Sequence, residues 1–230
     1  MSIITVGFDA DDTLWHNERH FRMTEERFAD LLADYAEKDH LAERLLEAEK
    51  KNVGHYGFGV KGFVLSMIET AIEVTDERVP ARVIRELIDT GRDLLTYPIE
   101  LMPGAAEVIA ACAGRYELVL ITKGDLLDQE RKLAQSGLGE SFDGIEIVSD
   151  KTSKIYADIF ARHGGAERSM MVGNSLKSDV IPAIEAGAWG IHVPSDITWA
   201  LEHADAPESE ARFRTIPTLH ELPLLLESLT

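Results

Sequence analysis

Hydrophobic residues in this chain form short runs that alternate with segments of helical periodicity. The apolar runs predict buried strands at 3–8, 117–122, 145–148, 170–173 and 190–193. Each run is followed by a loop and then by apolar residues spaced three or four apart. This pattern is typical of a parallel sheet covered by helices, so the sequence predicts an α/β fold.

The segment 18–96 interrupts this alternation because it contains several helical patterns and no convincing strand. One apolar helical face runs through 60–72 and another through 83–88, where Pro80 suits the first turn of a helix. Three glycines within 52–59 mark a loop or a break in a helix between the first patterns. We therefore expect a core domain formed by residues 1–17 and 97–230, with residues 18–96 as an inserted helical bundle.

Composition narrows the set of partners. The chain has 230 residues, with 23 Lys and Arg against 41 Asp and Glu, and its formal charge of −18 argues against binding nucleic acid. No apolar run is long enough to span a bilayer, and the N-terminus leads into an acidic motif instead of a signal peptide. The single cysteine, Cys112, fits a reducing compartment. We expect a cytoplasmic protein with no nucleic-acid or membrane partner.

The strongest chemical signal follows the first predicted strand. Asp9, Asp11 and Asp12 place three carboxylates within four residues, and such charges repel one another unless a cation compensates them or water surrounds them. Mg²⁺ prefers oxygen ligands and commonly bridges protein oxygens to a substrate phosphate, so the segment predicts a magnesium site. The alternative is that Asp11, Asp12 and Thr13 only cap a turn into the next helix.

Other strand ends add suitable groups. The second strand ends at Thr122, and the following Lys123 and Gly124 offer an ammonium group and backbone N–H groups suited to an anion. The fourth strand leads into 174–179, which supplies oxygen ligands, and Lys154 begins a helical pattern after the third. Taken singly, each of these residues is more commonly a turn residue, a helix cap or a solvated surface charge.

Taken in order, these segments resemble the motifs of the haloacid dehalogenase superfamily. The matching segments are Asp9-x-Asp11-x-Thr13, the strand ending at Thr122, Lys154 followed by Phe160, and Gly173-Asn-Ser-Leu-Lys-Ser-Asp179. The resemblance implies a Rossmann-like core, and the helical insertion is similar to the α-helical cap of that family. Members are mostly Mg²⁺-dependent phosphatases, so the cofactor implied is Mg²⁺.

The resemblance also implies roles. Asp9 matches the nucleophile that becomes an aspartyl phosphate, and Asp11 matches the general acid and base. Thr122 and Lys154 match the groups that bind the transferring oxygens, and Lys154 is expected to keep Asp9 ionised, with Lys151 as a nearby competitor.

The resemblance also implies a set of metal ligands and a set of substrate contacts. Metal ligands are expected at Asp9, Asp11 (through its backbone carbonyl), Asn174 and Asp179. Substrate contacts are expected at Thr13, Lys123, Gly124 and Lys61, the last in the cap.

Two positions depart from the family pattern. Asn174 stands where an aspartate usually follows the glycine of the fourth motif, and Asp12 stands where many relatives have glycine. The expected activity is hydrolysis of a small phosphorylated metabolite, a phosphomonoester. The alternatives are a dehalogenase or a phosphomutase on the same fold, or a phosphate-ligand binding protein weakened in catalysis by Asn174.

Overall fold

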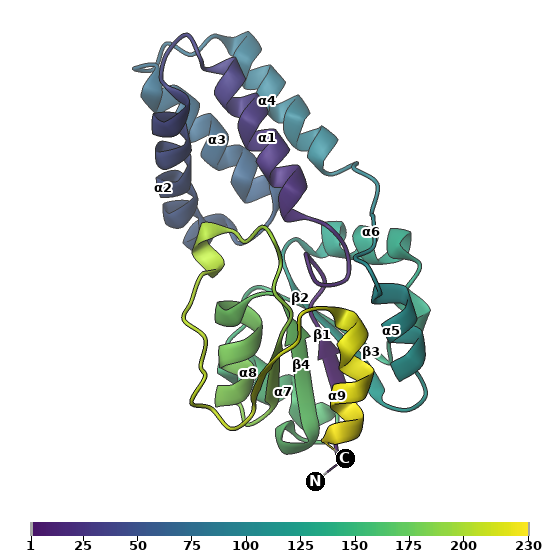
Figure 1. Cartoon of the computed structure of the whole chain (residues 1–230). Coiled ribbons are helices and arrows are strands. Elements are labelled where there is room, and N and C mark those ends of the chain that lie inside the picture. Colours follow the sequence, from purple (N-terminus) through teal and green to yellow (C-terminus); the bar gives the residue numbers. More distant parts are fainter. Residues whose placement is uncertain (1, 230) are drawn as a thin grey trace. The chain divides into compact units, whose positions relative to one another are not determined.

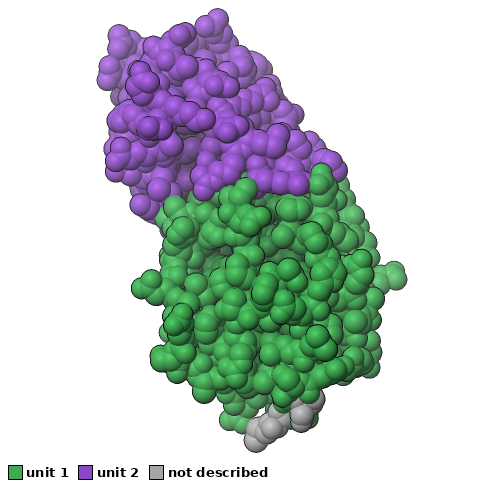
Figure 2. Space-filling view, in the orientation of Figure 1, with its two compact units in different colours: residues 1–18, 99–230 green, residues 19–98 purple. Residues whose placement is uncertain are grey.

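The computed structural model describes residues 2–229, which divide into two compact units (Figure 2). The core unit consists of the chain up to residue 18 and from residue 99 onward, and the cap unit consists of residues 19–98. In the part of the chain described, no helix is both long and apolar enough to cross a membrane.

The core unit contains a parallel sheet (Figure 1). Its strand order is β3-β2-β1-β4-β5-β6. Its strands are β1 (Thr5–Phe8), β2 (Glu117–Lys123), β3 (Gly144–Val148), β4 (Ser169–Gly173), β5 (Trp189–His192) and β6 (Phe213–Thr215). The predicted α/β class and the first five strands are confirmed. The sequence does not predict β6, because this short edge strand has no buried side chain and therefore no apolar run.

Both faces of the sheet are buried, as the alternation along β2 shows. Leu118 and Leu120 join one apolar cluster, whereas Val119 and Ile121 join another. The first cluster includes side chains of α5, α6 and α9, and the second includes side chains of α7 and α8. These helices are α5 (Ala105–Cys112), α6 (Leu126–Ser136), α7 (Ser153–Arg162), α8 (Ile181–Glu185) and α9 (Leu222–Ser228).

The inserted unit is a bundle of helices with its own apolar core. Its helices are α1 (Glu18–Leu31), α2 (Lys38–Tyr56), α3 (Val60–Val74) and α4 (Ala81–Leu94). Its largest buried side chains are those of Phe28, Leu32, Leu41, Leu45, Phe63, Met67 and Leu87. The break predicted within 52–59 is confirmed but short, because α2 continues to Tyr56 and only 57–59 separate it from α3. Gly57 and Gly59 have φ angles of 73° and 124°, which side-chain-bearing residues rarely adopt.

Candidate active site

The polar residues of the candidate site follow the carboxyl ends of β1, β2, β3 and β4. In a parallel sheet these ends lie at one edge, where open α/β folds bind ligands. Asp9 continues the line of β1, since its amide donates to the Val172 carbonyl at 2.9 Å. The chain then turns over the Ala10 carbonyl, which accepts from the amide of Leu14 at 2.8 Å. Asp11 is therefore on a turn and not on the strand.

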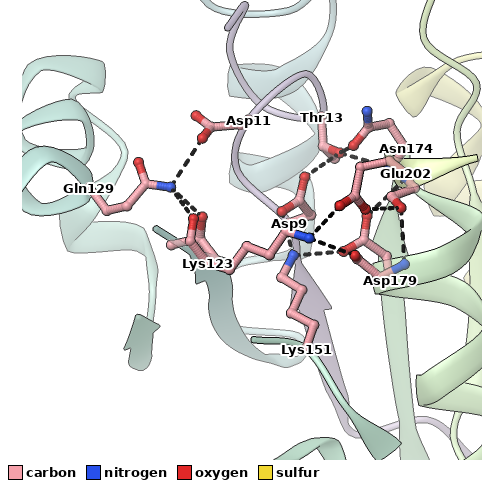
Figure 3. Close-up of polar contacts among 12 residues, drawn as sticks. Asp9, Asp11, Thr13, Lys123, Gln129, Lys151, Asn174, Asp179 and Glu202 are labelled. Atoms are coloured by element: carbon pink, nitrogen blue, oxygen red, sulfur yellow. Dashed lines mark hydrogen bonds and ion pairs between the residues drawn. The ribbon is translucent and has the colours of Figure 1, made fainter. Parts of the chain in front are cut away.

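A buried ammonium group lies between two carboxylates at the centre of the site (Figure 3). Lys151 Nζ is 2.5 Å from Asp9 Oδ1 and 2.6 Å from Asp179 Oδ1. The exposed fractions of the Lys151, Asp9 and Asp179 side chains are only 2%, 9% and 1%. The cluster thus contains two carboxylates and one ammonium group, and it is buried from water.

Burial and this charge balance perturb the cluster. Burial, together with the charge of Asp179, raises the pKa of Asp9 from 3.8 to about 7, against the opposing effect of Lys151. Burial alone would lower the pKa of Lys151, but the charges of Asp179 and Asp9 outweigh it and raise that pKa well above its ordinary value. Lys151 therefore stays charged, and Asp9 is sensitive to any additional cation near it.

The structure corrects the prediction that Lys154 keeps Asp9 ionised. Lys154 Nζ instead pairs with Asp158 Oδ2 at 2.5 Å on α7, and its side chain is 83% exposed. The reason is the start of α7, where Thr152 Oγ1 caps the helix by accepting from the Ile155 amide at 3.3 Å. Lys151 precedes this cap and reaches Asp9, whereas Lys154 lies in the first helical turn and faces solvent.

Asp179 lies on a π-helical turn, Leu176–Val180, directly after β4. Its Oδ2 accepts from the Ser175 amide at 2.9 Å, while its Oδ1 contacts Lys151. Gly173 makes room for this arrangement, because a Cβ atom there would lie 2.2 Å from Asp179 Oδ2. The last residue of β4 therefore allows a carboxylate to turn back over the strand end.

Thr13 connects the first and fourth motifs. Its hydroxyl is 3.0 Å from Asp9 Oδ2 and 3.3 Å from Asn174 Oδ1, and it accepts from the Asn174 amide at 3.0 Å. With 1% of Thr13 exposed, these contacts occupy the hydroxyl that we expected to bind substrate. The structure thus places Thr13 inside the site as a link between Asp9 and Asn174.

The Asp11 carboxylate has a separate set of partners. It accepts from Trp15 Nε1 at 2.8 Å, from Gln129 Nε2 at 3.1 Å and from Lys132 Nζ at 3.1 Å. Figure 3 shows Asp11 directed toward Gln129 and away from the cluster of Asp9 and Lys151. Sequence reasoning missed Gln129 and Lys132, although their spacing of three residues places both on one face of α6.

Asp12 is the capping residue that the alternative interpretation expected. Its carboxylate accepts from the Asn17 amide at 2.9 Å and from the Glu18 amide at 2.9 Å, at the start of α1. Its φ of 61° is in the left-handed region, which explains why glycine is also suited to this position. Burial raises the pKa of Asp12 from 3.8 to about 6, despite these amide donors.

At the end of β2, Thr122 is 1% exposed and its hydroxyl accepts from Gln129 Nε2 at 2.7 Å. Lys123 Nζ contacts Ser178 Oγ at 2.8 Å and Glu202 Oε1 at 2.5 Å. Gly124 has a φ of 137°, and its amide donates to the Val148 carbonyl at 3.3 Å. This amide is therefore occupied in the structure and is not free for the anion contact that we expected.

Glu202 is a third residue that sequence reasoning missed, after Gln129 and Lys132. It lies in a short 3-10 turn, Ala200–Glu202, and its Oε2 accepts from Ser175 Oγ at 2.6 Å. Burial alone would raise the pKa of Glu202, but Lys123 and the neighbouring hydroxyl groups lower it. Glu202 therefore anchors both Lys123 and the start of the fourth motif.

Lys61 lies in the first turn of α3, in the cap unit, with its side chain exposed. Its substrate contact stays a prediction.

The oxygen-rich site suits a hard cation. Asp9 and Asn174 offer a carboxylate and an amide oxygen that share Thr13 as a neighbour, and the cluster carries excess negative charge. Between residues 2 and 229, no group of three or more His, Cys, Asp or Glu side chains forms a metal site by itself. Mg²⁺ needs no such group, because it commonly keeps several waters and uses one or two carboxylates. The residues that could hold it are Asp9, Asn174, Asp179 and the backbone carbonyl of Asp11.

These features define an α/β protein with a Rossmann-like core, an inserted helical unit and a carboxylate at the end of β1. The family described as haloacid dehalogenase-like hydrolase matches residues 3–187. A crystal structure of a haloacid dehalogenase-like family hydrolase from Xanthomonas campestris is 41% identical, with a TM-score of 0.89, covering 99% of this chain and 92% of that one. This chain belongs to the haloacid dehalogenase-like hydrolase family.

Curated relatives are phosphatases. Pyrimidine 5'-nucleotidase YjjG of Escherichia coli (strain K12) is 31% identical over 133 residues, covering 54% of this chain and 56% of that protein. Glyceraldehyde 3-phosphate phosphatase of Methanothermobacter thermautotrophicus is 34% identical over 92 residues, 37% of this chain and 40% of that protein. This chain therefore spans about half the length of these relatives.

The fold is also shared with a more distant structure that contains the metal. YfnB from Bacillus subtilis, a putative hydrolase of this family bound to magnesium, has a TM-score of 0.70 at 18% identity, covering 98% of this chain and 99% of that one.

Proposed function

We propose that this hydrolase is a Mg²⁺-dependent phosphomonoesterase that cleaves small phosphorylated metabolites through an aspartyl phosphate on Asp9. The observation that carries the proposal is the buried cluster of Asp9, Lys151 and Asp179, which presents a carboxylate at a strand end beside a fixed positive charge. The phosphatase relatives support the reaction class.

In the first step an Asp9 oxygen attacks phosphorus and the ester bond breaks. The electron pair of that bond leaves with the alcohol oxygen, which takes a proton from Asp11. Bound Mg²⁺ would supply positive charge that offsets the repulsion between Asp9 and the phosphoryl group. Lys151 fixes the Asp9 side chain, and Thr122 offers its hydroxyl to the transferring oxygens.

In the second step water attacks the phosphorus of the aspartyl phosphate. Asp11, now a carboxylate, accepts a proton from that water, and the bond between phosphorus and Asp9 breaks to release phosphate. Asp9 and Asp11 can take these different roles because their neighbours differ, with Lys151 and Thr13 around one and Trp15, Gln129 and Lys132 around the other.

The test is phosphate release from a panel of nucleoside monophosphates, sugar phosphates and p-nitrophenyl phosphate, with Mg²⁺ or with EDTA. We expect release that requires Mg²⁺ and disappears in Asp9→Asn. Activity retained by that variant would refute the aspartyl phosphate. Halide release from a 2-haloacid that persists in EDTA would support a dehalogenase, and an isomerised sugar phosphate without free phosphate would support a mutase. Tight ligand binding without turnover at saturating Mg²⁺ would support a binding protein.

A further inference from the structure

One neutral side chain of α6 joins the first and second motifs. Gln129 Nε2 is 2.7 Å from Thr122 Oγ1, 3.0 Å from the Lys123 carbonyl oxygen and 3.1 Å from Asp11 Oδ2. Only 3% of Gln129 is exposed, so these contacts are formed out of water. The amide group thus contacts both the hydroxyl and the carboxylate to which the proposed reaction assigns chemistry.

The direction of these hydrogen bonds matters for Thr122. A threonine hydroxyl has one hydrogen to donate and lone pairs to accept with. Because Gln129 donates to Thr122 Oγ1, it occupies a lone pair and leaves the hydroxyl hydrogen for another acceptor. A phosphoryl oxygen is such an acceptor, so an amide donor at Gln129 suits a hydroxyl that must donate to substrate.

Asp11 receives support from the same face of the helix. Lys132 Nζ is 3.1 and 3.2 Å from the two Asp11 oxygens and 2.7 Å from Asn17 Oδ1. Gln129 and Lys132 thereby hold the Asp11 carboxylate from the side of α6. Trp15, which follows Asp11 in the same turn, donates to this carboxylate through its indole N–H. Gln129 alone links this carboxylate to Thr122 among the contacts within residues 2–229.

We propose that Gln129 is a positioning residue that sets two groups of the active site at once: it directs the Thr122 hydroxyl hydrogen toward the phosphoryl group and holds Asp11 in place for proton transfer. This inference rests on the proposed phosphatase reaction. Gln129 itself does not react, and the side-chain amide acts only through its donor hydrogens.

The test compares two substitutions of similar size with a control on the same helix. Gln129→Met removes the donor, and Gln129→Glu replaces it with a group that accepts from Thr122 and repels Asp11. Gln135→Met makes the same chemical change as the first variant on an exposed residue of α6. Circular dichroism and thermal unfolding establish that each variant is folded before its kinetics are measured.

We expect Gln129→Met to lower kcat about 10- to 100-fold, with a smaller change in KM, and Gln129→Glu to lower it further. The loss should be larger for an alkyl phosphate than for p-nitrophenyl phosphate, because a poor leaving group depends more on its proton from Asp11. Gln135→Met should keep the wild-type values. In an Asp11→Ala background, Gln129→Met should lower kcat by a smaller factor than it does in the wild type.

Wild-type kcat in both folded Gln129 variants would overturn the inference, and an equal loss for both leaving groups would overturn its Asp11 half. A wild-type protein that releases phosphate from no ester would instead refute the proposed function. Crystal structures of the wild type and Gln129→Met would then test the heavy-atom part of the positioning: a displaced Asp11 carboxylate or a changed Thr122 side-chain rotamer would support it, and an unchanged Asp11 carboxylate would refute its Asp11 half.

Discussion

Replacing Lys151 by methionine tests the central cluster most directly. Methionine keeps most of the side-chain length but removes the ammonium group that lies 2.5 Å from Asp9 and 2.6 Å from Asp179. The variant therefore leaves two carboxylates buried without their cation. Lys154→Met is the matched control, since it makes the same change three residues later in an exposed pair with Asp158.

The structure predicts very different losses of unfolding free energy for Lys151→Met and Lys154→Met. Removing one partner of a buried ion pair typically costs about 3–5 kcal/mol of unfolding free energy, because the remaining charge is left uncompensated. An exposed pair four residues apart on a helix contributes about 0.3–0.5 kcal/mol. With side chains 2% and 83% exposed, Lys151 and Lys154 belong to these two classes.

The deficit of Lys151→Met should also depend on pH. In the folded wild type the pKa of Asp9 is about 7, above its ordinary 3.8, so the folded state takes up this proton more readily than the unfolded state. Loss of Lys151 raises that pKa further. As pH falls, protonation of Asp9 removes one of the two buried charges in the variant. The loss of unfolding free energy of Lys151→Met relative to wild type should therefore be smaller at pH 5.5 than at pH 8.

Urea unfolding at the two pH values, followed by circular dichroism, measures these differences, and phosphate release measures activity. We expect Lys151→Met to lose turnover by at least about 100-fold, while Lys154→Met retains it. A Lys151→Met deficit below about 1 kcal/mol, or one that is equal at both pH values, would refute the reasoning from the buried cluster. Loss of activity in Lys154→Met alone would restore the prediction made from the sequence.

Further substitutions test the surroundings of the cluster. Asp12→Asn should raise the unfolding free energy at pH 7.5 by about 1–3 kcal/mol, because the burial that raises the Asp12 pKa to about 6 disfavours its charge, and urea unfolding should show the gain vanish below pH 4. Gly173→Ala should cost about 1–3 kcal/mol in the same assay and reduce turnover, because its Cβ atom would meet Asp179 Oδ2; wild-type activity would contradict this steric argument. Glu202→Gln should lose about 1.5–3 kcal/mol of unfolding free energy by removing the negative charge that pairs with Lys123, and unchanged stability in urea would show that this charge contributes little.

The first five strands could be predicted because each contains an apolar run, including β3, which is only half-buried and has Ile145 48% exposed. β6 could not, since neither edge position nor pairing with β5 leaves an apolar signal in the three residues Phe213–Thr215. The cap could be separated from the core because its helical periodicity extends over 18–96 without a strand. The pattern of apolar residues thus located both units, whereas the strand pairing at the sheet edge became visible only in the three-dimensional structure.

Asp9, Thr13, Asn174 and Asp179 of the first and fourth motifs lie together in the structure, but the residue beside Asp9 is Lys151 and not Lys154 as predicted. The sequence held a signal for the correct choice, because Thr152 is a favoured residue at a helix N-cap and places Lys151 before the helix. Glu202 carried no such signal, since its partner Lys123 is 79 residues away along the chain. Long-range polar contacts of this kind are set by loop paths that local patterns do not encode.

The short spacing between Asp9 and Asp11 produces two environments because the chain changes from strand to turn between them. Asp9 keeps the direction of β1 and meets Lys151, whereas Asp11 turns toward α6 and meets Gln129. Perturbations of the two sets should therefore separate. A change at Lys151 alters the charge balance of the nucleophile and should appear as a pH-dependent loss with every ester, whereas a change at Gln129 should weigh most on esters with poor leaving groups. Identical kinetic signatures for the two variants would mean that the carboxylates act as one coupled unit, and the division of roles drawn from their neighbours would then be wrong.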